Sequence, residues 1–381
     1  MAATDNNTLA VVLAASALLS AVPLAQAQSA PEATTLSVKY GTYQDSQPGL
    51  DRVSVQAPTV YLQTPLAENW SFDGSWVSDS VSGPSPRMYD LVSSASTMSD
   101  HRTAGDAKLT RHFDRAAVSA SVAYSTEHDY TSKTYGLQGR VSSDDNNSTF
   151  TVGHAVSLDR IDNTSNGVNT AIDQRKRGRE FLVGWTQVLS DRDVVQANLT
   201  RTLARGYLND PYKFLDQRPD SRNAWVALVR WNHHLAGRDA AVRSSYRLYR
   251  DTYGVQAHTV SLEWVQSTGP WTLTPGVRYH SQSAADFFVN PVRLPDGSIN
   301  QGASIAAAVA QAGAKSMDQR LSAYGAVTLS LKTAYRLSAH DSVDVKVERY
   351  FQRAGWALGS GSAGMGPFNA WFAQVGWSHR F

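Results

Sequence analysis

Charged side chains recur at alternate positions in several segments of the chain, and their spacing suits recognition of charged solutes better than covalent catalysis. Residues two apart share one face of a β-strand. On one set of polar faces a basic group and an acidic group stand out. The basic group is Arg230, Arg243, Arg247 and Arg278, and the acidic group is Asp73, Asp79 and Asp106. Facing each other across an enclosed space, two such walls would create a field that orients dipolar solutes and selects by charge.

The same charges could instead pair with their neighbours and stiffen a filled interior. Arg243 and Glu263 illustrate this alternative, because they fall on the adjacent predicted strands 240–251 and 255–267 and could form an ion pair. Residue types and spacing leave both interpretations open.

Patterns typical of enzymes and metal sites are missing from the sequence. It has no Cys and no G-x-S-x-G motif, and its 10 His residues are scattered. His233 and His234 are consecutive on a predicted strand, so they would point to opposite faces and form a poor chelating pair. We therefore predict no catalytic residue, no metal site and no cofactor.

The elements that could position the charged walls are short alternating segments separated by turns. We predict sixteen strands, at 34–44, 51–63, 69–81, 101–113, 116–128, 132–143, 149–160, 179–190, 193–206, 222–235, 240–251, 255–267, 270–282, 319–337, 341–356 and 367–381. The predicted strand at 193–206 fits the alternation poorly, because Arg201 shares a face with Leu199 and Leu203. A β-bulge would restore the alternation.

The connections between these strands alternate in length. Short turns such as 236–239 and 268–269 alternate with longer loops at 82–100, 161–178, 207–221, 283–318 and 357–366. Short periplasmic turns and longer extracellular loops are typical of outer-membrane barrels. The predicted fold class is therefore all-β: a transmembrane antiparallel β-barrel of about 16 strands.

Composition agrees with a barrel and excludes other classes. Beyond the N-terminus we find no run of ~20 apolar residues, which a membrane-spanning helix would need. The 10 Trp and 16 Tyr residues suit aromatic girdles at two membrane interfaces. Phe181, Val183 and Trp185 exemplify the apolar faces that would meet lipid. A net charge of +2 gives no reason to expect a nucleic-acid partner.

The two ends of the sequence carry targeting signals. Residues 9–23 are apolar and precede Ala25-Gln26-Ala27, a cleavage site of the A-x-A type. We therefore expect a signal peptide at 1–27 and an outer-membrane barrel at 28–381. The last predicted strand ends at Phe381, and the apolar face that it closes resembles a signal read by the barrel-insertion machinery, although His379 stands where an aromatic residue is more usual. The residues of this predicted insertion signal are Trp371, Val375, Trp377 and Phe381.

Two loop regions carry further predictions. Residues 302–315 are rich in Ala, which favours a helix that could lie on the barrel or inside it and narrow the lumen; a mobile surface loop is the alternative. The stretch 174–179 is strongly basic, and Arg175, Lys176, Arg177 and Arg179 could contact lipopolysaccharide phosphates. A solvated run of charge is the alternative for this stretch.

Two stretches of the mature chain resemble a known family. They are D-S-Q-P-G-L-D-R at residues 45–52 with S-D-S-V-S-G-P-S-P-R at 78–87, and V-D-V-K-V-E-R-Y-F-Q-R-A-G-W at 343–356. They are similar to bacterial outer-membrane barrels catalogued as domain of unknown function 3570. The resemblance implies an outer-membrane barrel without an established substrate. Members are often encoded near flavin-attachment and small-lipoprotein genes, which suggests extracytoplasmic redox work.

Together these observations predict a protein of the cell outer membrane that is not an enzyme. The first functional hypothesis is a porin-like or substrate-specific channel for small polar or anionic solutes. The alternative is a non-conducting scaffold that anchors periplasmic or surface partners, such as an extracytoplasmic flavin redox system. We expect contacts with membrane lipid, lipopolysaccharide and the insertion machinery, and the strand number also allows a homo-oligomer.

Overall fold

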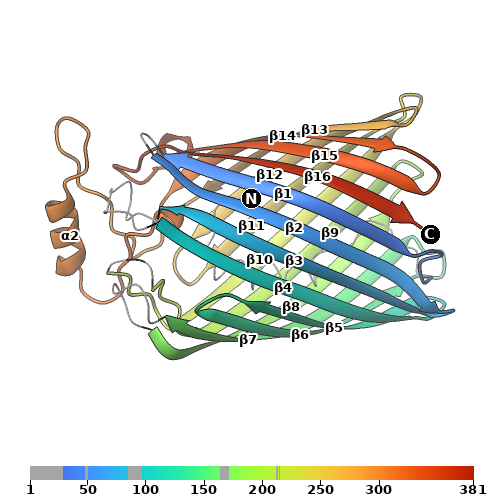
Figure 1. Ribbon diagram of the computed structural model, residues 1–381, viewed down its shortest axis with the longest axis horizontal. Coiled ribbons are helices and arrows are strands. Elements are labelled where there is room, and N and C mark those ends of the chain that lie inside the picture. The colour runs from blue at the N-terminus through green and yellow to red at the C-terminus, as the bar shows by residue number, and fades with distance from the viewer. Residues whose placement is uncertain (1–28, 48–49, 85–96, 164–170, 212, 214) are drawn as a thin grey trace.

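The computed structural model describes residues 29–47, 50–84, 97–163, 171–211, 213 and 215–381, and the predicted signal peptide lies outside these ranges. Sixteen strands form one closed antiparallel barrel, in which each strand pairs with its sequence neighbours and β1 pairs with β16 (Figure 1). This confirms the predicted fold. The strands are β1 (Thr35–Gln47), β2 (Leu50–Ala67), β3 (Trp70–Pro84), β4 (Thr97–His112), β5 (Ala116–Thr126), β6 (Tyr130–Ser142), β7 (Ser148–Asn163), β8 (Ala171–Val188), β9 (Asp193–Gly206), β10 (Ser221–Leu235), β11 (Ala240–Asp251), β12 (Gln256–Thr268), β13 (Trp271–Gln282), β14 (Tyr324–Arg336), β15 (Asp341–Arg353) and β16 (Phe368–Arg380).

In the part of the chain that the structure describes, the helical elements are few and short. Helix α2 spans Gln301–Ala310, and 3-10 turns occupy Gln319–Leu321 and Ala354–Trp356. Within the described residues, no helix is both long and apolar enough to cross a membrane.

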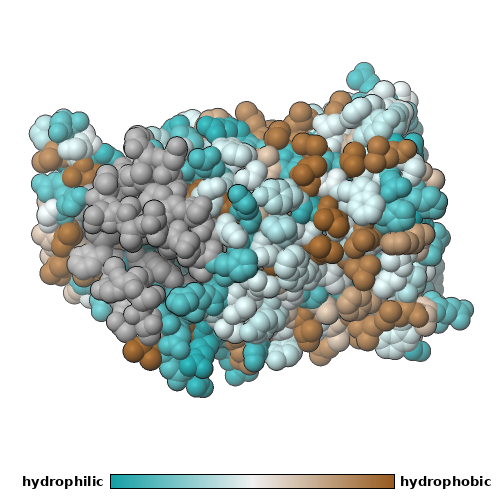
Figure 2. All heavy atoms as spheres, viewed as in Figure 1, coloured by the Kyte–Doolittle hydropathy of each residue, from teal (hydrophilic) through white to brown (hydrophobic). Residues whose placement is uncertain are grey.

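Alternation along each strand sends apolar side chains outward and polar ones into the lumen. Leu137, Val183 and Val375 face outward and are 63%, 57% and 52% exposed, whereas Asp159 and Glu180 on neighbouring inward positions are buried. Apolar residues gather over the strands in the space-filling view (Figure 2). This distribution reverses that of a soluble β-protein, as a lipid environment requires.

Two predicted strand starts differ from the structure by five residues or more. Strand β8 begins at Ala171 instead of 179, because the basic stretch continues the ladder with β7 through the pair Arg175 and Arg160. Strand β14 begins at Tyr324 instead of 319, because the Asp318 side chain caps the 3-10 turn by accepting a hydrogen bond from the Arg320 N–H.

The bulge predicted in the ninth strand is wrong. Strand β9 pairs with β8 and β10 in continuous register, with Arg201 opposite Phe181 and Trp225. Arg201 is tolerated on the outward face because its guanidinium lies 4.7 Å from the centroid of the Trp225 ring.

The ends of the barrel differ, as the predicted loop lengths require. The end that holds the C-terminus carries tight turns, and the opposite end carries the long loops and α2 (Figure 1). The turn between β12 and β13 places Gly269 at a φ of 57°, a left-handed value that glycine adopts without strain. In an outer-membrane barrel the tight turns are periplasmic and the long loops extracellular.

Candidate functional site

The four arginines of the predicted basic wall lie on β10, β11 and β13 and face the lumen at three successive levels. Arg243 stands opposite Asn232 and Glu263 nearest the periplasmic end. Two residues further along the strands come Arg230 and Arg278, and two further again comes Arg247. Consecutive levels are about 7 Å apart, because a strand rises ~3.3 Å per residue.

The middle level is a continuous row of donors. Strand pairing aligns Arg230 with Ser245, Ser245 with Ser261, and Ser261 with Arg278. Three strand spacings of ~4.8 Å separate the two arginine backbones by about 14 Å, and the two guanidinium groups lean away from each other, Arg230 toward β9 and Arg278 toward β14. The row therefore offers two forked cations with two hydroxyl groups between them, a donor set that suits carboxylate or phosphate.

Neutral or aromatic groups hold these arginines in place. Arg230 donates to Gln196 Oε1 at 3.0 Å, and Arg278 donates to Thr328 Oγ1 at 3.1 Å. The Arg247 guanidinium lies 5.5 Å from the centroid of the Tyr249 ring. Among the described residues, no carboxylate lies within 4 Å of any of the four guanidinium groups. Their charge is therefore available to a solute.

Arg243 and Glu263 do not form the ion pair that the sequence allowed. They are directly opposite in register, yet no contact within 4 Å joins them in the described structure. Both face inward and both are exposed, so the lumen at that level has room for solvent.

The acidic residues face inward too, but each already has a donor partner. Asp73 lies 3.3 Å from Lys108 Nζ and accepts hydrogen bonds from Tyr61 and Gln63, each at 2.9 Å. Asp79 accepts from Arg102 Nε at 2.7 Å, and Asp106 accepts from the Ser75 hydroxyl. Asp73 and Asp79 thus form ion pairs with neighbouring cations, as the second interpretation of the charged residues predicts.

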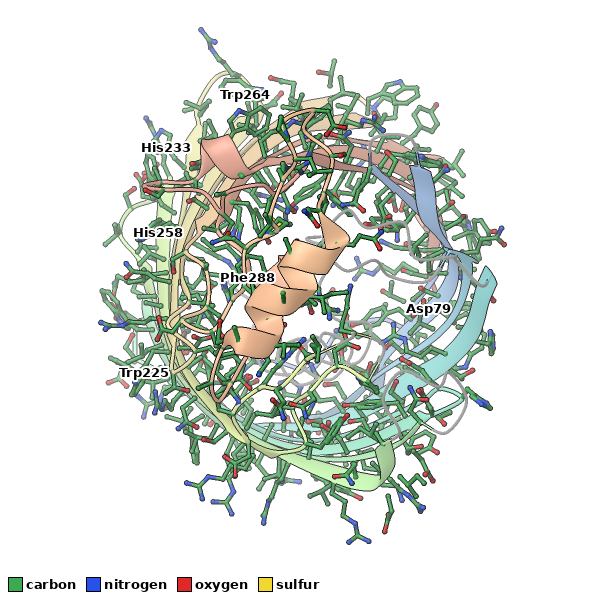
Figure 3. The ribbon with its side chains drawn as sticks, turned by 90° about the vertical axis from the view of Figure 1, so that its left-hand side faces the viewer. Asp79, Trp225, His233, His258, Trp264 and Phe288 are labelled. Atoms are coloured by element: carbon green, nitrogen blue, oxygen red, sulfur yellow. The ribbon has the colours of Figure 1, made fainter. Side chains whose placement is uncertain are left out.

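The two groups occupy opposite sides of the barrel. In the closed order of sixteen strands, β3 and β4 lie across from β11 and β12. Figure 3 shows Asp79 on the inner side of one wall, with His233 and His258 marking β10 and β12 on the other. Asp73 and Asp79 are balanced by Lys108 and Arg102, whereas the four arginines along β10 to β13 outnumber Glu263, the acidic residue that faces Arg243 on the same wall. The lumen therefore carries an excess of positive charge on this side.

Long loops lie over part of the extracellular mouth (Figure 3). We call residues 283–323 and the described part of 207–220 the lid. Helix α2, the predicted Ala-rich helix, ends at Ala310 and lies across the mouth instead of within the ring of strands (Figures 1 and 3). It is well anchored, because Asn300 Oδ1 accepts from the Ala303 N–H at 3.0 Å and Ser304 is fully buried.

The lid has an apolar core of its own. Phe287, Phe288, Met317 and Leu321 are buried there together, and Tyr253 from the β11–β12 connection packs edge-on against Phe287 with centroids 4.9 Å apart. The lid is therefore a packed structure attached to the barrel rim, and not the mobile loop that the sequence allowed.

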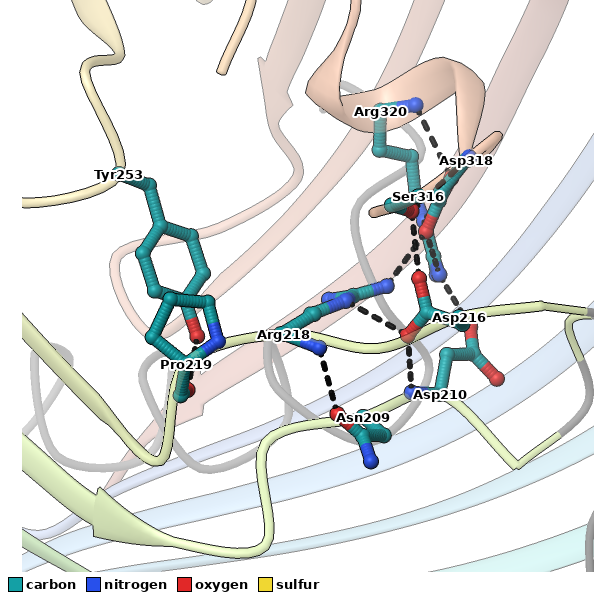
Figure 4. A network of polar contacts seen from close by, with 9 residues as sticks. All are labelled: Asn209, Asp210, Asp216, Arg218, Pro219, Tyr253, Ser316, Asp318 and Arg320. Carbon is teal, nitrogen blue, oxygen red and sulfur yellow. Dashed lines mark hydrogen bonds and ion pairs between the residues drawn. The ribbon is translucent and has the colours of Figure 1, made fainter. Parts of the chain in front are cut away.

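A buried ion network joins the two segments of the lid (Figure 4). Arg218 Nε lies 2.8 Å from Asp216, and Arg218 Nη2 lies 2.9 Å from Asp318. Arg320 contacts Asp318 and Asp210, and Ser316 donates to Asp216. The side chains of Asp216 and Asp318 are 0% exposed.

The two buried carboxyls respond differently to this environment. Burial acts to raise the pKa of Asp318, but the nearby charges of Arg320, Lys213 and Arg218 outweigh it and hold that pKa well below its usual value. Burial raises the pKa of Asp216 above its usual value, although Arg218 acts against it. Asp318 is thus the charged anchor of the network, and Asp216 is the group whose protonation can change.

The basic stretch on β8 divides between the two faces of the barrel. Arg175, Arg177 and Arg179 face outward in line with Phe181. The prediction for Lys176 as a lipopolysaccharide contact is wrong, because its side chain faces the interior and its Nζ lies 3.3 Å from buried Asp159. Counting in steps of two from Phe181 already separates Lys176 from the three arginines.

The residues of the predicted insertion signal lie on the outward face of β16. Val375 and Trp377 are exposed there, and Phe381 is 67% exposed just after the strand. Trp371 and Trp377 hydrogen-bond to Gln44 and Asp341. Their role in insertion stays a prediction.

Sequence reasoning missed the hydroxyl row and the lid network. Ser245 and Ser261 are unremarkable until strand register places them between two arginines. The lid network joins Asp216 to Asp318 across a hundred residues, and no local pattern predicts that contact.

Comparison with protein families decides where the chain belongs. The model of the family described as protein of unknown function DUF3570 matches residues 8–90 and 92–378. The chain belongs to this family. No curated protein matches the sequence of this DUF3570 member.

Solved structures support the fold. The DUF3570 barrel is similar to a structure described as a bacterial polysaccharide outer membrane secretin, with a TM-score of 0.50 and 10% identity, covering 92% of this chain and 98% of the other. It is also similar to a Pseudomonas aeruginosa FadL homologue, with a TM-score of 0.43 and 13% identity over 91% and 89% of the two chains. The CymD monoaromatic hydrocarbon channel gives a TM-score of 0.46 and 10% identity, over 92% and 89%. The likeness at a TM-score of 0.50 supports the barrel fold alone, and closed barrels of this kind are found in outer membranes.

Proposed function

We propose that this protein is an outer-membrane channel for small anionic solutes, with an extracellular lid that controls entry. The observation that carries the proposal is the charge imbalance in the lumen. Arg230, Arg243, Arg247 and Arg278 have no carboxylate within 4 Å in the described structure, whereas Asp73 and Asp79 are paired with Lys108 and Arg102. Walls of Arg or Lys are a recurring basis of anion selectivity in pores.

The three levels suggest how an anion would move. Arg247, the Arg230–Arg278 row and Arg243 stand at successive depths, about 7 Å apart. A solute could contact the arginine of one level before it leaves the previous level, so the anion always has a cationic partner as it crosses the lumen. Several moderate sites of this kind allow both entry and release.

Planar-bilayer recordings of the refolded protein in a KCl gradient test the proposal. We expect a reversal potential that favours chloride over potassium, and the double variant R243Q/R247Q should lower the chloride preference severalfold. R111Q is the matched control, because Arg111 faces outward beside Trp70 and Phe113. An unchanged reversal potential in the double variant would remove these arginines from the proposal.

The lid favours a second candidate, a non-conducting scaffold that anchors periplasmic or surface partners, for example of an extracytoplasmic flavin redox system. A buried ion network and an apolar core would keep the mouth closed. Deletion of residues 302–315 separates the two candidates. Conductance after deletion favours a lidded channel, and silence of both folded proteins favours the scaffold.

A further inference from the structure

A cluster of arginines on β8 and β9 faces outward, away from the lumen, and therefore has no role in conduction. Arg177 and Arg179 on β8 and Arg205 on β9 are exposed, and Arg201 lies one level nearer the periplasm. Together with Leu203 and Asn223, Arg177, Arg179 and Arg205 line a surface depression of about 290 Å³. We call Arg177, Arg179, Arg201 and Arg205 the outer arginine cluster.

The cluster is electrostatically unbalanced. Arg177 and Arg205 are direct partners in the β8–β9 register, and like charges placed opposite each other destabilise a sheet. Within the described residues no carboxylate lies within 4 Å of any of the four guanidinium groups. By contrast, nearby Arg160 pairs with Asp162 and Asp173 at 3.2 and 3.3 Å. An external anion would relieve the repulsion that the protein itself leaves uncompensated.

The position of the cluster along the barrel identifies the source of that anion. On β8 the same outward face continues toward the periplasmic turn with Phe181 and Val183, which are 44% and 57% exposed. On β9, Leu199 is 47% exposed just below Arg201. The cluster therefore lies at the extracellular border of the lipid-facing band, where basic side chains meet anionic lipid headgroups.

From this placement we propose that the outer arginine cluster binds the phosphate groups of one lipopolysaccharide molecule in the outer leaflet. Arginine forks match phosphate oxygens, and Arg177 and Arg205 would clamp a phosphate monoester between two strands. The sugar-phosphate headgroup would sit in the depression, and its acyl chains would run along Phe181, Val183 and Leu199. The Arg201–Trp225 contact at 4.7 Å would form the lower edge of the site.

Native mass spectrometry of the detergent-solubilised, folded protein tests this proposal with synthetic lipid A that carries two phosphates. We expect one lipid A molecule per wild-type barrel, and roughly tenfold or more weaker binding for R177Q/R205Q, since each charge-assisted contact contributes on the order of a factor of ten. Lipid A with a single phosphate should bind with intermediate affinity. Heat-modifiable electrophoretic mobility would check that each variant is folded.

R349Q is the matched control. Arg349 is an exposed, outward arginine near the extracellular end of β15, on the other side of the barrel, and lies beside Phe351. This variant should bind lipid A as the wild type does. Equal binding by R177Q/R205Q and wild type would overturn the proposal, and so would an equal loss in R349Q. Phosphatidylglycerol or inorganic phosphate binding as tightly as lipid A would also overturn it, because the site would then not be specific for lipopolysaccharide.

Discussion

Replacing Arg218 with Ala should open the lid. The Arg218 side chain is 4% exposed and contacts two carboxylates that are 0% exposed, those of Asp216 and Asp318. Removing one partner of a buried ion pair costs up to roughly 3–5 kcal/mol, and here the cost falls mainly on Asp216, because Asp318 keeps its contact with Arg320. At 1.4 kcal/mol per factor of ten, a lid population that is open about 1% of the time would become mostly open.

Single-channel recordings measure this change as open probability. R218A should raise it strongly, and R218K should have an intermediate effect, because an ammonium group cannot form both forked contacts. R111Q is again the control, since Arg111 lies on β4 outside the lid and faces outward beside Trp70 and Phe113. If R218A gates like the wild type while removal of residues 302–315 opens the channel, the network does not hold the lid.

Three further changes have defined outcomes. Burial raises the pKa of Asp216 in the closed lid, so protonation of Asp216 favours closure. Wild-type open probability should therefore increase as the pH rises from about 4 towards neutrality, while Asp318 stays charged. D216N should flatten this pH dependence, and equal slopes in the two proteins would contradict the reasoning. Gly269→Val should lower the free energy of unfolding in urea by about 1–2 kcal/mol, from backbone strain alone, since no atom lies within 4 Å of an added Cβ; a loss of several kcal/mol would show that strain is not the whole cost. Deletion of Phe381 should lower the fraction of heat-modifiable barrel in outer membranes, and an unchanged fraction would show that it is no part of an insertion signal.

Strand number and facing could be predicted because lipid imposes a strict rule on each strand. Outward positions such as Val183 and Leu137 must be apolar, so the alternation of apolar and polar residues can be recognised even in a chain of ordinary composition. The rule weakens where the strands leave the hydrocarbon. Arg175 to Arg179 therefore resembled a loop, although they belong to β8.

The candidate site was predictable only in part, for a different physical reason. Parity along a strand places Arg243 or Arg278 in the lumen, but the partners of a lumen charge depend on neighbouring strands and on side-chain reach. Asp79 on β3 forms an ion pair with Arg102 on β4, whereas Arg243 and Glu263 face each other without forming one. The lid depends on contacts between loops that are distant in the sequence, and the period-two pattern of the strands does not predict such contacts.

Closure of the barrel by β1 and β16 has a consequence for biogenesis. The hydroxyl groups of Ser37 and Ser378 lie 2.7 Å apart although 341 positions separate them in the chain. A chain interrupted anywhere before β16 would leave two unpaired strand edges, whose backbone groups find no water in hydrocarbon. Partial barrels have no stable resting place in the membrane, so assembly should be all-or-none, and any factor that assists it must protect both edges until the last strand arrives.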